Sequence, residues 1–266
     1  MRAQPLRWAL FIVLSIAFVT LFTSLFVGPP PVLFSATVLA LLLGIVAAGS
    51  FFLNLGVFVR PVRAGAPHVS AVAFTFDDGP HPVHTRRVMD LLEAADARGT
   101  FFVIGEKARR EPELVKEMAV RGHELALHSF AHDHFLNMRA EREISEDLAR
   151  NQNAIADAAN VRPQLFRPPV GLTSPRIQVA VEELGLRVIG WSARAFDGAS
   201  TPDRETTNRR VRRGLRPGAI VLLHDAQERG EAAPSSIDAL PDLLAAAQAR
   251  GLRCVTVSDL LAAGEL

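Results

Sequence analysis

Two pairs of side chains in this sequence have the types and spacing that hydrolytic chemistry requires, and the first is a pair of adjacent carboxylates. Asp77 and Asp78 follow the apolar run 71–76, and Gly79-Pro80 then turns the chain away. Adjacent carboxylates repel each other, so such a pair most often lies in a solvated turn or a helix cap. The alternative is a functional pair, in which one carboxylate binds a metal ion and the other acts as a general base.

The second pair is formed by His128 and His132, which are four positions apart. This spacing predicts a helical turn that points both imidazoles to one side, where they could share an ion. Two histidines and one carboxylate are a common ligand set for catalytic zinc, with the remaining position open. The alternative is a pair of surface or capping histidines. His123 and His134 flank the motif, but His134 has a phenylalanine four positions before it, so we favour His128 and His132.

Three further polar groups stand at the ends of apolar, strand-like runs. A rigid Pro-Pro turn follows Arg167 and could fix its guanidinium beside a carboxylate. Asp197 follows a run that ends in Trp191, and His224 ends the run 220–223. Taken singly, each is more often a loop residue or a structural histidine. Ligands of parallel α/β folds bind at the carboxyl ends of strands, which is where all of these groups stand.

The elements that must position these groups alternate between strand and helix from about residue 69 onward. An apolar stripe predicts a helix over Thr85–Arg98, and Ser174-Pro175 is a good start for another, which Gly185 ends. Further helices are expected over 112–121, around 144–155 and over 237–249, where Pro241 marks the expected true start. Strands are expected over 71–76, 100–104, 124–127, 187–191, 219–223 and 253–257. Such alternation predicts parallel βαβ units and barrel-like closure, with an open doubly wound sheet as the alternative.

The apolar residues of the chain are concentrated before residue 60. Hydrophobic residues make up 49% of the 266 residues, and the runs 8–27 and 32–57 carry no charge. Each run is long enough to cross a bilayer core, which takes about 20 residues. The sequence Gly28-Pro29-Pro30-Pro31 breaks the helix between them, so we predict a transmembrane helical hairpin. A single anchor or signal segment is the alternative.

Charge and cysteine content bound the possible partners and the orientation. The net charge of +1 implies no nucleic-acid partner, and one cysteine can form no internal disulfide. Arginines flank the two apolar runs and none lies between them, namely Arg2, Arg7, Arg60 and Arg63. The positive-inside rule then predicts an integral protein of the cytoplasmic membrane with its catalytic domain on the cytoplasmic face. The expected organisation is a two-helix membrane anchor at 1–60, a linker at 61–68 and a catalytic domain at 69–266.

Taken in order, these fragments resemble the polysaccharide deacetylases, carbohydrate esterases that include chitin deacetylases and peptidoglycan N-acetylglucosamine deacetylases. The resemblance covers residues 70–262 and rests on five ordered motifs: Thr75–Pro80, His128-Ser129 with His132, Arg167-Pro168-Pro169, Trp191 with Asp197, and Leu223-His224. It implies a distorted (β/α) barrel with fewer than eight full strands. It also implies a metal-dependent hydrolase that removes N-acetyl groups from the amino sugars of a polysaccharide, an oligosaccharide or a lipid-linked glycan.

The resemblance further implies a role for each motif residue, beginning with the metal and the base. The expected ligands of one divalent ion, usually Zn²⁺, are Asp78, His128 and His132. Asp77 would be the general base that takes a proton from the attacking water, and Arg167 would hold this carboxylate by charge pairing. These roles make chemical sense, because amide hydrolysis needs an activated water and a stabilised oxyanion.

On the other side of the site, the resemblance implies that His224 is the general acid and that Asp197 orients it. A histidine with a pKa near ~6.5 can deliver a proton to the departing amine at neutral pH. Trp191 and Leu223 would line a small pocket for the acetyl methyl group. The backbone N–H of Val170 would help to stabilise the oxyanion.

Two positions depart from the family pattern. Val170 stands where most members have an aromatic residue, usually tyrosine, and this chain has no tyrosine. Arg194 stands where many members have an acidic residue. The first change removes a side-chain wall of the sugar site, and the second alters the local charges. Neither affects an expected metal ligand, the base or the acid.

Three classes of function compete for this sequence. They are a deacetylase, a catalytically inactive carbohydrate-binding relative, and a structural membrane protein with an accidental set of motifs. The complete set of ligands, base and acid favours the enzyme. A short linker would keep the domain against membrane lipid, which favours a substrate at the bilayer. Such a lipid-linked amino sugar could carry a formyl group, and the enzyme would then be a deformylase.

Overall fold

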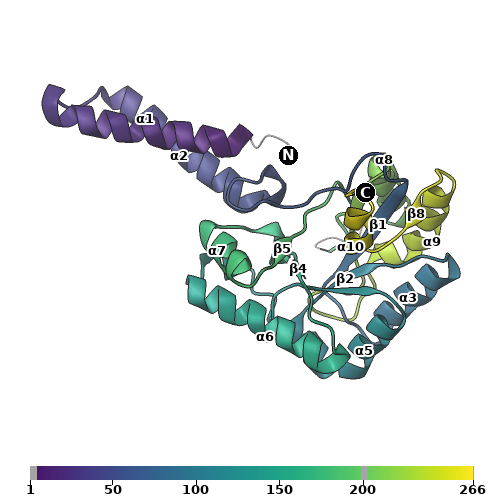
Figure 1. Ribbon diagram of the computed structural model, residues 1–266. Coiled ribbons are helices and arrows are strands. Elements are labelled where there is room, and N and C mark those ends of the chain that lie inside the picture. Colours follow the sequence, from purple (N-terminus) through teal and green to yellow (C-terminus); the bar gives the residue numbers. More distant parts are fainter. Residues whose placement is uncertain (1–4, 199–202, 266) are drawn as a thin grey trace.

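The larger part of the protein is a curled sheet of parallel strands that is covered by helices on its outer face (Figure 1). The structure is a computed structural model that describes residues 5–198 and 203–265. Its strand order is β5-β4-β3-β2-β1-β7-β6, and β8 pairs with the start of β1. The strands are β1 Ala71–Asp77, β2 Thr100–Val103, β3 Glu124–Leu127, β4 Leu165–Phe166, β5 Arg187–Val188, β6 Ala193–Arg194, β7 Ala219–His224 and β8 Arg253–Cys254. The predicted distorted (β/α) barrel is confirmed.

Helices follow most of the strands and bury their apolar stripes against the sheet. In α6, for example, Ile144, Leu148 and Ile155 are fully buried, as the sequence pattern predicts. The helices of the domain are α3 His84–Ala94, α4 Gly105–Arg110, α5 Pro112–Val120, α6 Glu141–Ala159, α7 Pro175–Glu183, α8 Arg204–Gly214, α9 Ser235–Gln248 and α10 Val257–Ala262. Short 3₁₀ helices are η1 Leu53–Leu55, η2 Leu136–Met138 and η3 Pro169–Gly171.

Four of the predicted elements have the wrong bounds. The helix expected over Thr85–Arg98 already ends at Ala94. The strands expected at 187–191 and 253–257 each keep only their first two residues. The second of them is cut short because Val257 already begins α10. Pro241 does not start α9 but lies inside it, and the helix begins at Ser235. The residues before Pro241 stay helical because most of them pack into the core, which offsets the hydrogen bond that proline cannot donate.

Alternation along the strands separates two layers of core and directs the functional side chains inward. Phe74 and Phe76 of β1 belong to the large core between the sheet and its helices, whereas Ala71 and Ala73 belong to the smaller core inside the barrel. The same alternation turns Asp77, the last residue of β1, toward the inside. Asp77 is paired in register with His224 of β7, so two strand ends bring these side chains to one place.

The segment expected to be a linker lies in the gap between the two edges of the sheet. Val62 forms a parallel bridge with Ile189, just after β5, and Ala64 forms an antiparallel bridge with Ala219 at the start of β7. The Gly65 N–H donates to the carbonyl of Gly218 at 2.8 Å. These backbone contacts help to close the barrel. The division of the chain at residues 60 and 68 otherwise stays a prediction.

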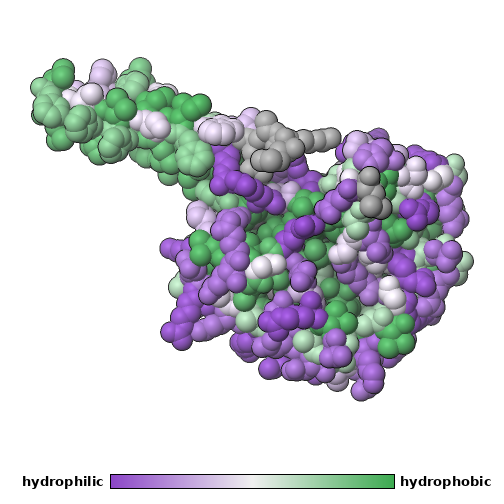
Figure 2. Space-filling view, viewed as in Figure 1, coloured by the Kyte–Doolittle hydropathy of each residue, from purple (hydrophilic) through white to green (hydrophobic). Residues whose placement is uncertain are grey.

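Two apolar helices, α1 Pro5–Val27 and α2 Val32–Phe51, lie side by side and project from the domain as a hairpin (Figure 1). Both are long and apolar enough to cross a membrane, and Figure 2 shows their surface as almost wholly hydrophobic. The second helix ends at Phe51, earlier than the apolar run suggests. The chain instead folds back, so that Leu53 is buried in the core of the domain and Val57 is buried close to Gly49 of α2.

The end of the hairpin is bonded to the loops that follow β4 and β5. The Thr173 hydroxyl donates to the carbonyl of Gly49 at 2.7 Å, and the Thr173 N–H donates to the carbonyl of Ser50 at 2.9 Å. The Asn54 amide donates to the carbonyl of Trp191 at 3.0 Å. The hairpin therefore has a fixed attachment to the part of the barrel that carries Trp191.

Candidate active site

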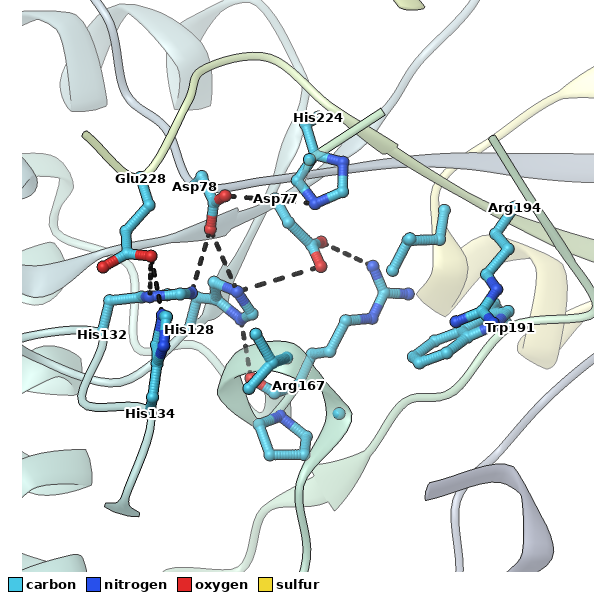
Figure 3. A pocket seen from close by; sticks show the side chains of 15 residues that line it. Asp77, Asp78, His128, His132, His134, Arg167, Trp191, Arg194, His224 and Glu228 are labelled. Atoms are coloured by element: carbon cyan, nitrogen blue, oxygen red, sulfur yellow. Dashed lines mark hydrogen bonds and ion pairs between the residues drawn. The ribbon is translucent and has the colours of Figure 1, made fainter. Parts of the chain in front are cut away.

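A cavity of about 250 Å³ opens among the carboxyl ends of the strands and contains most of the predicted site residues (Figure 3). Its walls come from strand ends and loops that are far apart in the sequence. The predicted residues that line it are Asp77, Asp78, His128, His132, Arg167, Val170, Trp191 and His224. Asp197 lies behind His224, and Leu223 is directed elsewhere, as described below.

On one side of the cavity, Asp77 forms a buried ion pair with Arg167. The guanidinium donates to Asp77 Oδ1 at 2.6 Å and to the Thr75 hydroxyl at 2.9 Å. It also lies 4.0 Å from the ring centre of Phe102 and donates to the carbonyls of Ile189 at 3.3 Å and of Gly190 at 3.1 Å. Burial lowers the pKa of Arg167 while Asp77 opposes this, and the group stays charged at neutral pH. The pair thus holds the Asp77 carboxylate in one orientation.

Next to this pair, Asp78, His128 and His132 form a compact triangle of buried ligand atoms. Asp78 Oδ1 is 3.3 Å from His128 Nε2 and 3.2 Å from His132 Nε2. Burial opposes ionisation of Asp78, but the neighbouring imidazoles of His128 and His132 hold its pKa well below the usual value. The carboxylate therefore stays ionised beside two imidazole rings.

The triangle has the dimensions and chemistry of a metal site. Ligand atoms about 2.0–2.1 Å from a tetrahedral zinc ion lie about 3.3 Å from each other, which agrees with both distances. Asp78 Oδ1, one of these ligand atoms, is buried and has no hydrogen-bond partner among the described residues. The carbonyl of Arg167 accepts from His128 Nδ1 at 2.8 Å, which leaves the Nε2 lone pair facing Asp78. These residues fit a divalent metal ion.

The backbone around these histidines differs from the expected helical turn, and that prediction is wrong. Residues 128–132 form no helix, and Ser129 and His132 have the positive φ values of 63° and 52°. The Ser129 hydroxyl accepts from the His132 N–H at 3.0 Å and stabilises this tight loop. The loop brings the ring centres of His128 and His132 to 4.9 Å. The two rings converge, but through left-handed residues rather than through helical spacing.

Across the cavity, His224 is held by Asp197. Asp197 is fully buried, and its Oδ1 accepts from His224 Nδ1 at 2.9 Å while its Oδ2 accepts from the His224 backbone N–H at 3.1 Å. Burial disfavours the charged imidazolium, but Asp197 outweighs it and raises the pKa of His224 to about 10. His224 Nε2 points into the site, 4.0 Å from Asp78 Oδ2. A Cβ at Gly198 would lie 2.5 Å from this nitrogen, so only glycine fits there.

The apolar wall of the cavity corrects one prediction. Trp191 and Val170 line it, and Val170 is 58% exposed at the rim with a φ of 48°, which is unusual for a β-branched residue. Leu223 does not line it, because strand alternation buries Leu223 in the outer core. Its neighbour Leu222 faces the cavity instead.

Glu228 is a cavity residue that the sequence reasoning missed. It lies in the loop after β7, with Oε2 at 2.7 Å from His134 Nε2 and at 3.5 Å from His132 Nδ1 (Figure 3). His134, set aside in the sequence analysis, therefore reaches the edge of the site. His123 lies elsewhere in the core, where burial lowers its pKa to about 4. A single acid in a polar loop carries no signal that could have identified Glu228.

Lys107 and Asp225 were also missed, and they support the site from behind. Lys107 Nζ donates to the carbonyls of Asp78 and Gln227 at 2.7 Å each, which ties the loop after β1 to the loop after β7. Asp225 is fully buried, accepts from the Thr85 hydroxyl, and has its pKa raised to about 6 by burial. Asp225 directly follows His224 in the sequence, but the sequence does not show that Thr85 and Lys107 lie beside it.

Comparison with known proteins agrees with this arrangement. The family profile described as polysaccharide deacetylase matches residues 64–189, which include the paired carboxylates, both histidines and Arg167. The peptidoglycan-N-acetylglucosamine deacetylase of Bacillus cereus is 35% identical over 192 residues, covering 71% of this chain and 87% of the relative. The chitooligosaccharide deacetylase of a Bradyrhizobium species is 34% identical, covering 68% of this chain and 86% of the relative.

A solved structure extends the likeness to the fold. The family 4 acetyl xylan esterase of Clostridium thermocellum, determined in complex with a cobalt ion, superposes with a TM-score of 0.66 at 31% identity. The match covers 73% of this chain and 91% of that structure. The family assignment rests on sequence identity over 87% and 86% of the length of the Bacillus cereus and Bradyrhizobium relatives, together with the shared barrel. The chain belongs to the polysaccharide deacetylase family of hydrolases.

Proposed function

We propose that this chain is a metal-dependent deacetylase that hydrolyses the N-acetyl group of an amino sugar within a glycan. One observation carries the proposal. Asp77 and His224, paired in register on neighbouring strands, face the Asp78–His128–His132 triangle from two sides. Amide hydrolysis needs a base and an acid on either side of the reacting carbonyl, and this arrangement supplies both. The names of the Bacillus cereus and Bradyrhizobium relatives support an N-acetylated glycan as the substrate.

Asp78, His128 and His132 would hold the ion, through Oδ1 and the two Nε2 atoms that already converge. When bound, a divalent ion such as Zn²⁺ makes water more acidic and polarises the substrate carbonyl. The cobalt ion in the structure of the Clostridium thermocellum relative supports the binding of a metal ion by this chain as well.

The chain's own residues would carry the proton transfers. Asp77 takes a proton from the attacking water, and Arg167 holds this carboxylate in a fixed orientation. His224 donates a proton from Nε2 to the departing amine nitrogen, and Asp197 stabilises the imidazolium before that transfer. The raised pKa of His224 means that it holds this proton at neutral pH.

The remaining cavity residues would bind the acetyl group. Trp191 and Leu222 supply apolar surface for its methyl, and both line the same cavity as the triangle. The backbone N–H of Val170 would donate to the oxyanion. The exposed rim at Val170 leaves this side of the sugar site without an aromatic wall.

Removing the metal is expected to abolish deacetylation. After treatment with a chelator, acetate release from acetylated chitooligosaccharides should fall to background, because the triangle alone cannot activate water. One equivalent of Zn²⁺ should restore it. Bound metal is measured by mass spectrometry, and circular dichroism checks that the chelated protein stays folded. Full activity in protein that contains no metal would refute metal dependence.

We also infer that the α1–α2 hairpin is a membrane anchor. Its side chains are exposed over almost the whole length of both helices, including Trp8, Phe18, Leu25 and Leu39. A soluble monomer rarely leaves so large an apolar surface in water, whereas a bilayer would cover it. Because the hairpin is bonded to the barrel near Trp191, the anchor would hold the cavity close to the membrane. This favours a lipid-linked or nascent glycan as the substrate.

The arginines beside the hairpin predict that the domain faces the cytoplasm. Two crossings return the chain to its starting side, where Arg2 and Arg7 hold the first end. Alkaline phosphatase fused after Leu266 should therefore be inactive, because this reporter works only outside the cytoplasm. The same reporter fused between residues 28 and 31, after one crossing, is the matched control and should be active. A strongly active fusion at Leu266 would reverse the assignment and favour an exported polymer as the substrate.

A further inference from the structure

Arg194 presents a positive charge to the mouth of the cavity and has no ion-pair partner among the described residues. Within residues 5–198 and 203–265, its guanidinium donates no hydrogen bond and forms no ion pair. It is held instead by stacking, 3.7 Å from the ring centre of Phe196 and 5.6 Å from that of Trp191. Figure 3 shows Arg194 lying against Trp191. A guanidinium stacked on aromatic faces keeps its N–H edge available for a planar, bidentate contact with an anion.

The other charges of the cavity are already engaged. Arg167 is paired with Asp77, and Glu228 contacts His132 and His134. These interactions leave Arg194 as the unmatched cation among the described residues that line the cavity. A neutral chitooligosaccharide offers such a group nothing to neutralise, whereas a substrate with an anionic group beside its amino sugar does.

The position of the α1–α2 hairpin indicates which anionic group would pair with Arg194. Asn54, just beyond α2, is bonded to the backbone of Trp191, and Arg194 stacks on the indole of the same residue. Leu53 is also buried close to Gly171, another residue of the cavity wall. The free guanidinium thus stands on the wall to which the apolar hairpin is bonded. An anion at this place that enters from a bilayer is the phosphate of a lipid headgroup.

We propose that Arg194 binds the phosphate of a polyprenyl-phosphate-linked amino sugar and so selects a lipid-linked substrate over a neutral glycan. This inference rests on the proposed deacetylase function and adds a recognition site to it. The phosphate joins the lipid to the sugar, so its capture by Arg194 would position the sugar between this residue and the Asp78–His128–His132 triangle.

The test compares Arg194→Gln with the wild type as full-length protein in bilayer nanodiscs. Three substrates are used: polyprenyl-phosphate-linked N-acetylglucosamine, N-acetylglucosamine 1-phosphate and chitotetraose. The ratio of kcat/KM for the lipid-linked sugar to that for chitotetraose should fall roughly 10- to 100-fold, the usual effect of losing charge-assisted hydrogen bonds. Arg194→Lys should recover part of the ratio, because it keeps the charge but not the bidentate edge. Arg213→Gln, an exposed arginine on α8, is the matched control and should leave the ratio unchanged.

Each alternative outcome decides against a named part of the proposal. If this kcat/KM ratio is unchanged in Arg194→Gln, whether because neither value falls or because both fall equally, Arg194 binds no anion. If the wild type has the same kcat/KM for N-acetylglucosamine 1-phosphate as for the lipid-linked sugar, the lipid part of the substrate is not recognised. Binding of polyprenyl phosphate alone, measured by calorimetry, should weaken to the same extent in Arg194→Gln. If no substrate releases acetate, the deacetylase function fails, and this binding measurement still decides the role of Arg194.

Discussion

Replacing Asp77 with asparagine is expected to lower kcat for deacetylation by roughly 10²- to 10⁴-fold while leaving the bound metal in place. The substitution removes the proposed base but keeps a side chain of nearly the same shape. Arg167 retains its bonds to Thr75, Ile189 and Gly190, so the wall of the cavity should persist. Steady-state acetate release and metal content of the purified variant measure the two effects separately.

Asp78→Asn provides the contrast, because this residue belongs to the triangle of ligand atoms. A site with three protein ligands depends on each of them, so Asp78→Asn should lose both activity and most of its metal. Asp157→Asn, on the exposed surface of α6, is the matched control and should change neither. Equal metal loss in the Asp77 and Asp78 variants would contradict the division of labour between the two carboxylates.

The second large effect is expected from Arg167→Met, on stability as well as on turnover. The substitution keeps an apolar side chain against Phe102 but leaves the buried Asp77 carboxylate without its counter-charge. Breaking a buried ion pair from one side typically costs about 3–5 kcal/mol. The Asp77 carboxylate would also lose the donor that fixes its orientation, so it would no longer be positioned as a base. Urea unfolding and acetate release should therefore both show large losses.

A double substitution separates the unpaired charge from simple loss of packing. In Asp77→Asn/Arg167→Met no buried charge remains, so the free energy of unfolding should recover much of what Arg167→Met loses. Arg142→Met removes an exposed arginine that is paired with Glu146 across one helical turn. This surface control should have no measurable effect. No recovery in the double variant would mean that Arg167 acts mainly through its contacts with Phe102 and the backbone carbonyls.

Much of the barrel could be predicted because its strands and helices carry strong local patterns. The strand at 124–127 and the start of α7 at Pro175 follow from an apolar run and a capping serine, and the structure has both at the predicted residues. The helix α8 was not predicted, because its sequence is rich in arginine and only Thr207 and Val211 are buried. Pro241 was misread because tertiary packing outweighs the local preference of proline.

The site was predictable where chemistry alone identifies the residues, and not where backbone shape does. Paired carboxylates and histidines stand out in a sequence by their type. The positive φ of Ser129 and His132 carries no such signal, so the correct residues were predicted with the wrong local backbone. Leu223 was assigned to the cavity in place of Leu222, since a motif does not say which way a strand residue points.

The bridges at Val62 and Ala64 also impose an order on biosynthesis. These residues leave the ribosome before any strand that they touch, while Ile189 and Ala219, their partners, emerge only after most of the domain has been made. At typical rates of translation the wait is on the order of ten seconds. Throughout that time the nascent sheet keeps an unpaired edge, where strands of other chains could add. The hairpin is complete by then, so insertion into a bilayer would hold each growing chain apart from its neighbours until these two bridges form.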